Sequence, residues 1–236
     1  MKLVKILFVL LFISGCSFFN GEKDASLKDY DWYLQINEQL NFENIQNITR
    51  VQNLIINDVA NETFSSLQVK ENGYNNYTYH LYVKENDEEY DSYYLNEINY
   101  INNNEERYQK KVLLNAYKKL IGKYLHTDFK AISITGIKEM VISDTTINIK
   151  LNDSGVLEYF NDLFSNNGMY IQEPDFTDGN VEISYVFGNY ILKQVTVLGE
   201  IEFKNKKASI NEVININDAE DFEILEDLET YGANLD

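Results

Sequence analysis

The sequence has one cysteine, Cys16, among its 236 residues. A single cysteine forms no intramolecular disulfide and supplies no thiolate cluster for a zinc site, so the fold must depend on packing and hydrogen bonds. The sequence also has one proline, Pro174, and two histidines, His80 and His126. Neither histidine lies in a pattern that suggests a catalytic triad or a metal pair. We therefore expect no metal site and no histidine-based catalysis.

Basic residues are also few. The chain has 20 Lys and Arg against 38 Asp and Glu, a formal net charge of −18. A protein this acidic is repelled by the phosphates of nucleic acids, which excludes that class of partner. The sequence has no Gly-rich phosphate loop, nucleophile elbow or His-Glu-x-x-His pattern, so we expect no cofactor and no enzyme. A pair of catalytic carboxylates stays open, because a glycosidase needs only two of the acids present.

No apolar run near the amino terminus is long enough for a membrane span. Ile6–Ile13 has eight apolar residues, far fewer than the roughly 18 that cross a bilayer. A short basic start precedes it, and Ile13-Ser14-Gly15-Cys16 follows. This pattern resembles a bacterial lipoprotein signal peptide with its lipobox. The resemblance implies a diacylglyceryl group on the Cys16 sulfur, cleavage after Gly15, and acylation, such as by palmitate, of the new amino terminus. A plain secretory signal is the alternative, but it leaves the position of the only cysteine unexplained.

The lipobox resemblance also predicts location and domain layout. The mature protein is expected on the extracytoplasmic side of the cell membrane or outer membrane, held by its lipid. We predict a signal peptide over 1–15, a lipidated tether over 16–26, one domain over 27–216 and an acidic tail over 217–236. The tail has eight acidic residues and no basic one. It is predicted to be solvated, or to dock a short helix through Phe222, Ile224, Leu225 and Leu228. A monomer is favoured.

Apolar residues at a three-to-four spacing predict four helices. The first begins after Ser26 and has Tyr30, Tyr33, Leu34 and Leu40 on one face. A second run covers 42–59, the clearest helix covers 105–125, and a short helix covers 156–164. Helix 105–125 has six basic residues opposite its apolar stripe. These residues are Arg107, Lys110, Lys111, Lys118, Lys119 and Lys123. They form either a solvated face or a face that contacts anionic lipid headgroups.

Alternating apolar and polar residues predict strands. These strands begin near Phe64 and include 77–83, 93–101, 132–142, 146–151, 181–187, 191–203 and 208–216. Tyrosines line the first strands, as suits a half-buried sheet surface or a platform for a carbohydrate or amphiphile. Residues 166–180 are predicted to be irregular. Their acids lack the spacing of a calcium loop, so we interpret them as a polar turn: Glu173, Asp175 and Asp178, with Glu182 just beyond.

The predicted elements define an α+β fold. The stretches TINIKLNDSGVLEYFNDLF (146–164) and VEISYVFGNYILKQVTVLGEIEFKNKKASINEVININD (181–218) resemble LolA/LppX-type bacterial lipoproteins. The resemblance implies a curved antiparallel sheet, half-barrel-like, with helices on one face and a noncatalytic cavity for a lipid or other amphiphile between them. The alternative is an envelope surface interaction protein with a filled core and no small-molecule ligand. Candidate cavity-lining residues are Tyr79, Leu81, Tyr94, Leu120, Tyr185, Phe187, Val195 and Val197.

Overall fold

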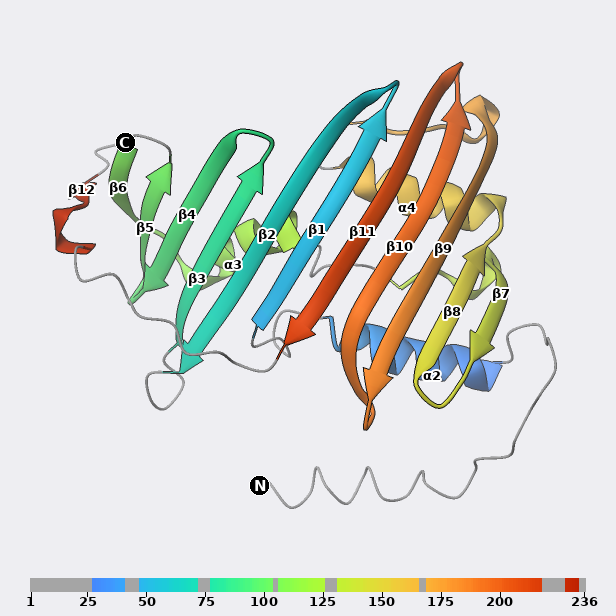
Figure 1. Ribbon diagram of the computed structural model, residues 1–236, viewed down its shortest axis with the longest axis horizontal. Helices are drawn as coiled ribbons and strands as arrows, with labels where there is room; N and C mark the ends of the chain where they lie inside the picture. Colours follow the sequence, from blue (N-terminus) through green and yellow to red (C-terminus); the bar gives the residue numbers. More distant parts are fainter. Residues whose placement is uncertain are drawn as a thin grey trace.

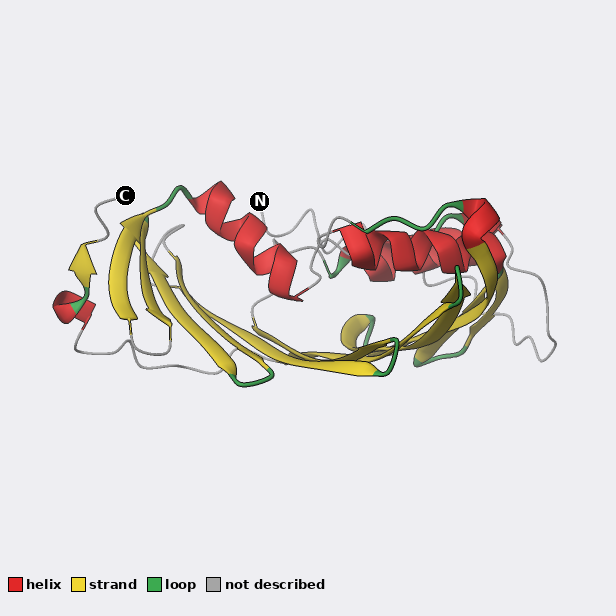
Figure 2. Cartoon of the chain, turned by 90° about the horizontal axis from the view of Figure 1, so that it is seen from above, coloured by secondary structure: helices red, strands yellow, loops and turns green. Residues whose placement is uncertain are grey.

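The computed structural model describes residues 27–40, 47–71, 77–103, 106–125, 131–165, 169–217 and 228–233. Cys16, the tether and His126 lie outside the described residues, as do Phe222, Ile224 and Leu225. Within the described ranges the chain is a mixed α+β fold built on one strongly curved, open sheet (Figures 1 and 2).

Two antiparallel meanders form this sheet. The first contains β1 (Asn47–Ile56), β2 (Val59–Glu71), β3 (Tyr77–Glu85), β4 (Glu88–Leu95), β5 (Ile98–Asn103) and β6 (Glu106–Lys111). The second contains β7 (Ile137–Ile142), β8 (Thr146–Leu151), β9 (Phe176–Gly188), β10 (Ile191–Phe203) and β11 (Lys206–Asn217). A short strand, β12 (Gly232–Ala233), lies at one edge, and the order in the sheet is β12-β6-β5-β4-β3-β2-β1-β11-β10-β9-β8-β7. The pairing of β1 with β11 is therefore the contact that joins the two meanders (Figure 1).

Tight turns connect β1 to β2, β4 to β5, β9 to β10 and β10 to β11. Asn57-Asp58, Asn96-Glu97, Asn189-Tyr190 and Lys204-Asn205 all have positive φ at both residues. Positive φ at both central residues is the requirement of a type I′ turn, whose twist matches that of the flanking strands. Asparagine tolerates this backbone region better than most residues. The asparagine-rich composition thus favours these hairpins locally.

Three helices and three short 3₁₀ turns complete the described residues. The helices are α2 (Leu27–Glu38), α3 (Leu114–Leu125) and α4 (Asp153–Ser165), and the turns are η3 (Ile134–Gly136), η4 (Glu173–Asp175) and η5 (Leu228–Thr230). α3 contacts β1 and β2, whereas α4 contacts β8 and β9. The predicted helices near 27–40 and 156–164 are confirmed. Asn152 caps α4, since its Oδ1 accepts a hydrogen bond from the Gly155 N–H at 3.1 Å.

The predicted helix over 42–59 is wrong over 47–59, the part that the structure describes. Residues Asn47–Ile56 are β1, a central strand paired with β2 on one side and β11 on the other. Every second side chain of β1 from Ile48 to Leu54 is buried. Two of these four buried side chains, Arg50 and Gln52, are polar. The local sequence therefore did not show the period of two, and pairing with distant strands decides the structure.

Helix 105–125 is correct only in its second half. Residues Glu106–Lys111 form β6, which pairs with β5 from Ile98 to Asn103. The Val112 N–H then donates to the Glu97 carbonyl at 2.9 Å, which closes the hairpin before α3 begins. The predicted basic helix face is consequently divided between a strand and a helix.

Three other predictions also need correction. The predicted strand over 132–142 begins only at Ile137, because Ile134–Gly136 is the 3₁₀ turn η3. The predicted strand over 93–101 is a hairpin of β4 and β5, because Asn96-Glu97 turns the chain. The region 166–180 is irregular only in part, since β9 already begins at Phe176, which pairs with Phe203 of β10.

Most buried side chains form one core on the inward face of the sheet. Fully buried members from both meanders and the helices include Leu81, Tyr117, Phe160, Tyr185 and Val195. Gly136 and Gly155 let η3 and α4 meet closely, because a Cβ on Gly155 would lie 2.1 Å from the Gly136 carbonyl oxygen.

A second, small cluster lies near the carboxyl terminus. Leu228 and Tyr231 pack with Tyr93 and the half-buried Tyr100. Tyr93 alternates along β4 with side chains of the main core, so this cluster lies on the opposite face of the sheet. Beside it, β12 (Gly232–Ala233) pairs in parallel with Tyr108 and Gln109 of β6. This part of the predicted tail is therefore docked on the domain.

Candidate ligand site

A buried ion pair lies where the two meanders join. Arg50 of β1 and Glu212 of β11 face inward, and the Arg50 Nε donates to the Glu212 Oε1. Their side chains are only 4% and 0% exposed. Burial of a single charge is very unfavourable, so each of the two side chains depends on the other.

Further hydrogen bonds tie this pair to its neighbours. The Arg50 Nη1 donates at 2.8 Å to the carbonyl of Tyr124, in the last turn of α3, where a cation also interacts favourably with the helix dipole. The Gln52 Nε2 donates weakly, at 3.4 Å, to the Glu212 Oε1. Ser65 is fully buried and lies directly across from Arg50 on β2.

Tyr159 of α4 interacts with the same carboxylate. Burial, and secondly the negative charge of Glu212, raise the pKa of Tyr159 well above the ordinary value of tyrosine. The phenol therefore stays protonated and can donate a hydrogen bond. We call Arg50, Gln52, Ser65, Tyr159 and Glu212 the central polar belt. It divides the inward face into two parts.

Four of the eight predicted lining residues lie on the α3 side of this belt. Tyr94 stacks on Tyr117 of α3 at 4.5 Å between ring centroids, and Tyr79 lies 6.0 Å from each of these rings. Leu81 is fully buried beside them, whereas Leu120 is only half-buried. Burial raises the pKa of Tyr79 to about 12. This part of the inward face is lined with aromatic rings.

The other four predicted residues lie on the α2 side. Tyr185 packs edge-on against Tyr33 at 5.5 Å, and its hydroxyl donates to the Asn37 Oδ1 at 2.9 Å. Phe187 meets Trp32 at 6.0 Å, and Val195 and Val197 are fully buried. Seven of the eight residues thus belong to the main core and Leu120 packs against it, but they form two groups, separated by β2, β1 and β11.

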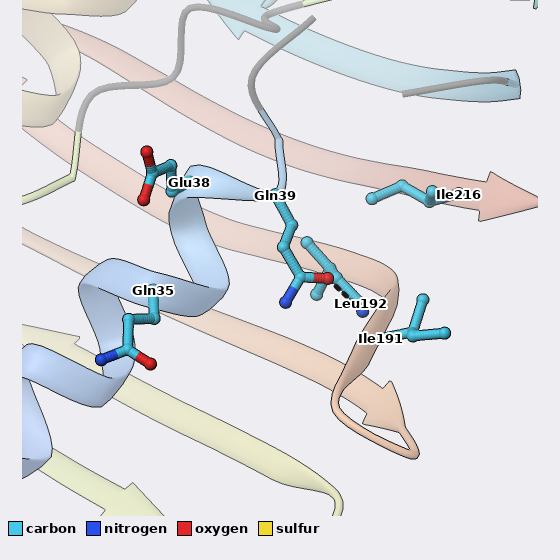
Figure 3. A pocket seen from close by; sticks show the side chains of 6 residues that line it. All are labelled: Gln35, Glu38, Gln39, Ile191, Leu192 and Ile216. Carbon is cyan, nitrogen blue, oxygen red and sulfur yellow. Dashed lines mark hydrogen bonds between the residues drawn. The ribbon is translucent and has the colours of Figure 1, made fainter. Parts of the chain in front are cut away.

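A cavity of about 400 Å³ opens beside the end of α2 (Figure 3). Polar side chains of the helix end form one wall, and apolar side chains of β10 and β11 form the other. The lining residues are Gln35, Glu38, Gln39, Ile191, Leu192 and Ile216. None of the eight predicted residues is among them. Two features of the sequence could have indicated this cavity. They are the apolar Ile191-Leu192 pair directly after a turn and the polar residues at the end of the first predicted helix.

Gln39 fixes the position of the helix end over this cavity. Its Nε2 donates to the Tyr190 carbonyl at 3.0 Å. Its Oε1 accepts from the Leu192 N–H at 2.9 Å (Figure 3). One side-chain amide thus satisfies both a donor and an acceptor of the β9–β10 hairpin. The result is an amphipathic cavity with a fixed rim, suited to a ligand that has a polar and an apolar end.

His80 and Asp175, two other candidates from the sequence, have structural contacts. His80 stacks on Tyr93 at 4.2 Å, and its ring nitrogens contact Asp91 at 2.7 Å and Gln68 at 3.0 Å. Asp175 forms an ion pair with Lys204 at 2.7 Å. Over the described ranges, no three His, Cys, Asp or Glu side chains gather as a metal site would require. No helix in the same ranges has the length and apolar character to cross a membrane.

Comparison of the sequence with protein-family models and with curated proteins finds no match in either.

Proposed function

We propose that this protein is a noncatalytic bacterial lipoprotein that is held by lipid on Cys16 at the cell membrane or outer membrane and binds an amphiphile. The observation that carries the proposal is the cavity between α2 and strands β10 and β11. The lipobox pattern Ile13-Ser14-Gly15-Cys16 supports the anchoring part. The ligand part depends on the cavity alone, so the two parts need separate tests.

The finer fold that we propose is a half-barrel with α2, α3 and α4 on its concave face. Figure 2 supports this arrangement, because the sheet is drawn as an arc and the three helices lie on the side toward which it curves. In such a fold, a cavity is expected between a helix and the sheet. The observed one lies at the carboxyl end of α2.

The cavity chemistry supports an amphiphile over a wholly polar ligand. Ile191, Leu192 and Ile216 offer an apolar wall, and Gln35 and Glu38 offer hydrogen-bonding groups at the rim. A volume of about 400 Å³ lies within the range of roughly 300–1,000 Å³ typical of small-molecule sites. We expect an acyl chain against the strands and a polar headgroup at the helix end.

One observation favours a second candidate, an envelope surface interaction protein with a filled core. The inward face under the helices is closely packed, with Leu81, Tyr117 and Tyr185 fully buried. Under this alternative the cavity is a surface depression with no ligand, and the outer face of the sheet carries the function.

Binding of a fluorescent fatty acid to the purified chain tests the ligand part. Ile191→Asp places a charge on the apolar wall of the cavity. We expect it to weaken binding about tenfold, because it removes buried apolar area and desolvates a carboxylate. Leu198→Asp is the matched control, since Leu198 is on the same strand and is similarly exposed, 49% against 55%. Equal binding by both variants, or no binding by the unmodified chain, would favour the second candidate.

Metabolic labelling with palmitate tests the anchoring part independently. The unmodified chain should incorporate the label and fractionate with membranes, and Cys16→Ser should abolish both. An unlabelled protein released into the soluble fraction would refute the lipid anchor without bearing on the cavity.

A further inference from the structure

We propose that the corner between β6 and α3 is a docking surface for an anionic lipid bilayer. This β6–α3 corner consists of Lys110, Lys111, Leu113, Leu114 and Lys119. The inference does not depend on the cavity beside α2, which lies under the other meander.

Two leucines are exposed at this corner. Leu113 is 66% exposed and Leu114 is 36% exposed. A single exposed leucine is ordinary on a soluble protein. Two in succession at the tip of an element, with lysines on both sides in the sequence, form the pattern of a segment that inserts at a membrane interface.

The backbone holds these leucines in place. Val112 is tied to Glu97 by the 2.9 Å hydrogen bond that ends the β5–β6 hairpin. The Leu113 carbonyl accepts hydrogen bonds from the N–H groups of Ala116 and Tyr117, at 2.9 and 3.1 Å, and so begins α3. Tyr117 is fully buried and fixes the helix to the sheet. The two leucines therefore project from a fixed turn between two anchored elements.

Charge complementarity identifies the partner. The three lysines of the corner are all exposed, in a chain whose formal net charge is −18. The Glu97 carboxylate lies 3.8 Å from the Lys111 Nζ, and both side chains are largely exposed. Lys110 precedes Lys111 on strand β6 and extends from the other face of that strand, and Lys119 follows on α3, five residues after Leu114. An anionic surface attracts this corner and repels the acidic remainder, so the attraction also orients the domain.

The six basic residues that were predicted to share one helix face do not all belong to the β6–α3 corner. The Arg107 guanidinium lies 5.8 Å from the ring centroid of Tyr231, at the small cluster on the opposite face of the sheet. Lys118 is half-buried and has a contact of its own. The structure thus replaces a uniformly basic helix face with a smaller corner that also carries exposed apolar groups.

Vesicle flotation tests the proposal. The protein is the mature chain, residues 16–236, with Cys16→Ser so that no lipid anchor contributes. We expect it to float with phosphatidylcholine vesicles that contain phosphatidylglycerol and not with phosphatidylcholine alone. Binding should weaken as salt is raised, because screening shortens the range of the lysine charges.

Variants separate the corner from other surfaces. Leu113→Asp, and separately the pair Lys110→Glu and Lys111→Glu, should each lower binding by about tenfold or more. The matched controls are Leu198→Asp and Lys206→Glu, which change one exposed leucine and one exposed lysine elsewhere. These controls should stay within about twofold of the parent chain.

Several outcomes would overturn the inference. They are equal binding to neutral and anionic vesicles, binding that ignores salt, and equal losses in the corner and control variants. A change of oligomeric state in Leu113→Asp would assign the corner to a contact between copies of the chain and would also overturn it. Thermal melts of each variant distinguish a lost surface from a lost fold. Palmitate labelling of Cys16 is unaffected by these outcomes, so the lipid anchor is judged separately.

Discussion

Removing one partner of the Arg50–Glu212 pair should destabilise the domain more than any other conservative change of charge. In Glu212→Gln, the Arg50 guanidinium keeps its charge with a side chain only 4% exposed. Loss of one partner of a buried ion pair costs about 3–5 kcal/mol, since the remaining charge is neither solvated nor neutralised. For a domain of this size, each kcal/mol lowers Tm by about 2–4 °C. We expect a Tm lower by about 6–20 °C.

Urea unfolding measures this change directly. Trp32 is the only tryptophan, and it contacts Phe187 and Tyr190, so its fluorescence reports on the α2 side of the core. Circular dichroism reports on the whole sheet. Glu182→Gln is the matched control, because Glu182 is 58% exposed and lies 3.6 Å from the Lys150 Nζ at the surface. An exposed pair of this kind contributes about 0–1 kcal/mol.

The double variant Arg50→Met with Glu212→Leu tests whether charge or packing explains the effect. Replacement of both charges by apolar side chains of similar size should restore stability to within about 1 kcal/mol of the unmodified chain, or exceed it. Refutation of the reasoning takes one of two forms. Either Glu212→Gln is no less stable than the surface control, or the loss of stability in the double variant equals the sum of the losses in Arg50→Met and Glu212→Leu.

Three other changes have calculable effects. Burial raises the pKa of Tyr33 and Tyr79 to about 12, whereas unfolded tyrosine titrates near 10. The contribution of each tyrosine to the free energy of unfolding should therefore be fully present below about pH 10. It should fall by about 1.4 kcal/mol per pH unit between about pH 10 and 12. Tyrosinate absorbance should rise together with unfolding, and gradual titration of a folded protein would contradict this. Gly155→Ala should cost about 1–3 kcal/mol in urea unfolding, because its Cβ would meet the Gly136 backbone at 2.1 Å, whereas Gly188→Ala, with no atom within 4 Å, should be nearly neutral. Tyr231→Ala removes ring contacts to Tyr100 and Arg107, so amide hydrogen exchange should accelerate in β6 and not in β3, and equal rates would show that the carboxyl-terminal contact does not stabilise this edge.

The elements predicted correctly are those with local signals. Apolar residues alternate over β9 from Val181, over β10 from Val195 to Ile201 and over most of β11, the turns between these strands have residues that accept positive φ, and Asn152 caps α4. The sequence failed at β1 because Arg50 and Gln52 occupy inward positions where apolar residues were expected. It failed at β6 because pairing with β5 overrides the helical preference of a Lys- and Glu-containing segment.

The same reasoning explains why the candidate site was predicted only in part. The eight predicted residues are inward-facing strand and helix positions, and strand alternation is enough to assign seven of these eight positions to the main core. Alternation does not reveal which core positions lie beside a cavity, since that depends on where α2 ends over β10. Glu212 was the neglected signal. It stands between Ile210 and Ile214 at a position of inward parity, and a charged residue there requires a buried partner.

The location of the ion pair bears on how the sheet selects its register. Hairpins form within each meander through short turns, but β1 and β11 come from distant parts of the chain and meet only when the two meanders join. Apolar inward residues on both strands would also tolerate a shift by two residues, because side chains keep the same face after such a shift. A shift of that size would separate Arg50 from Glu212 and leave both charges buried without each other. We infer that the pair adds little net stability and instead penalises the alternative registers, so the polar residues that concealed β1 in the sequence are the ones that specify where it pairs.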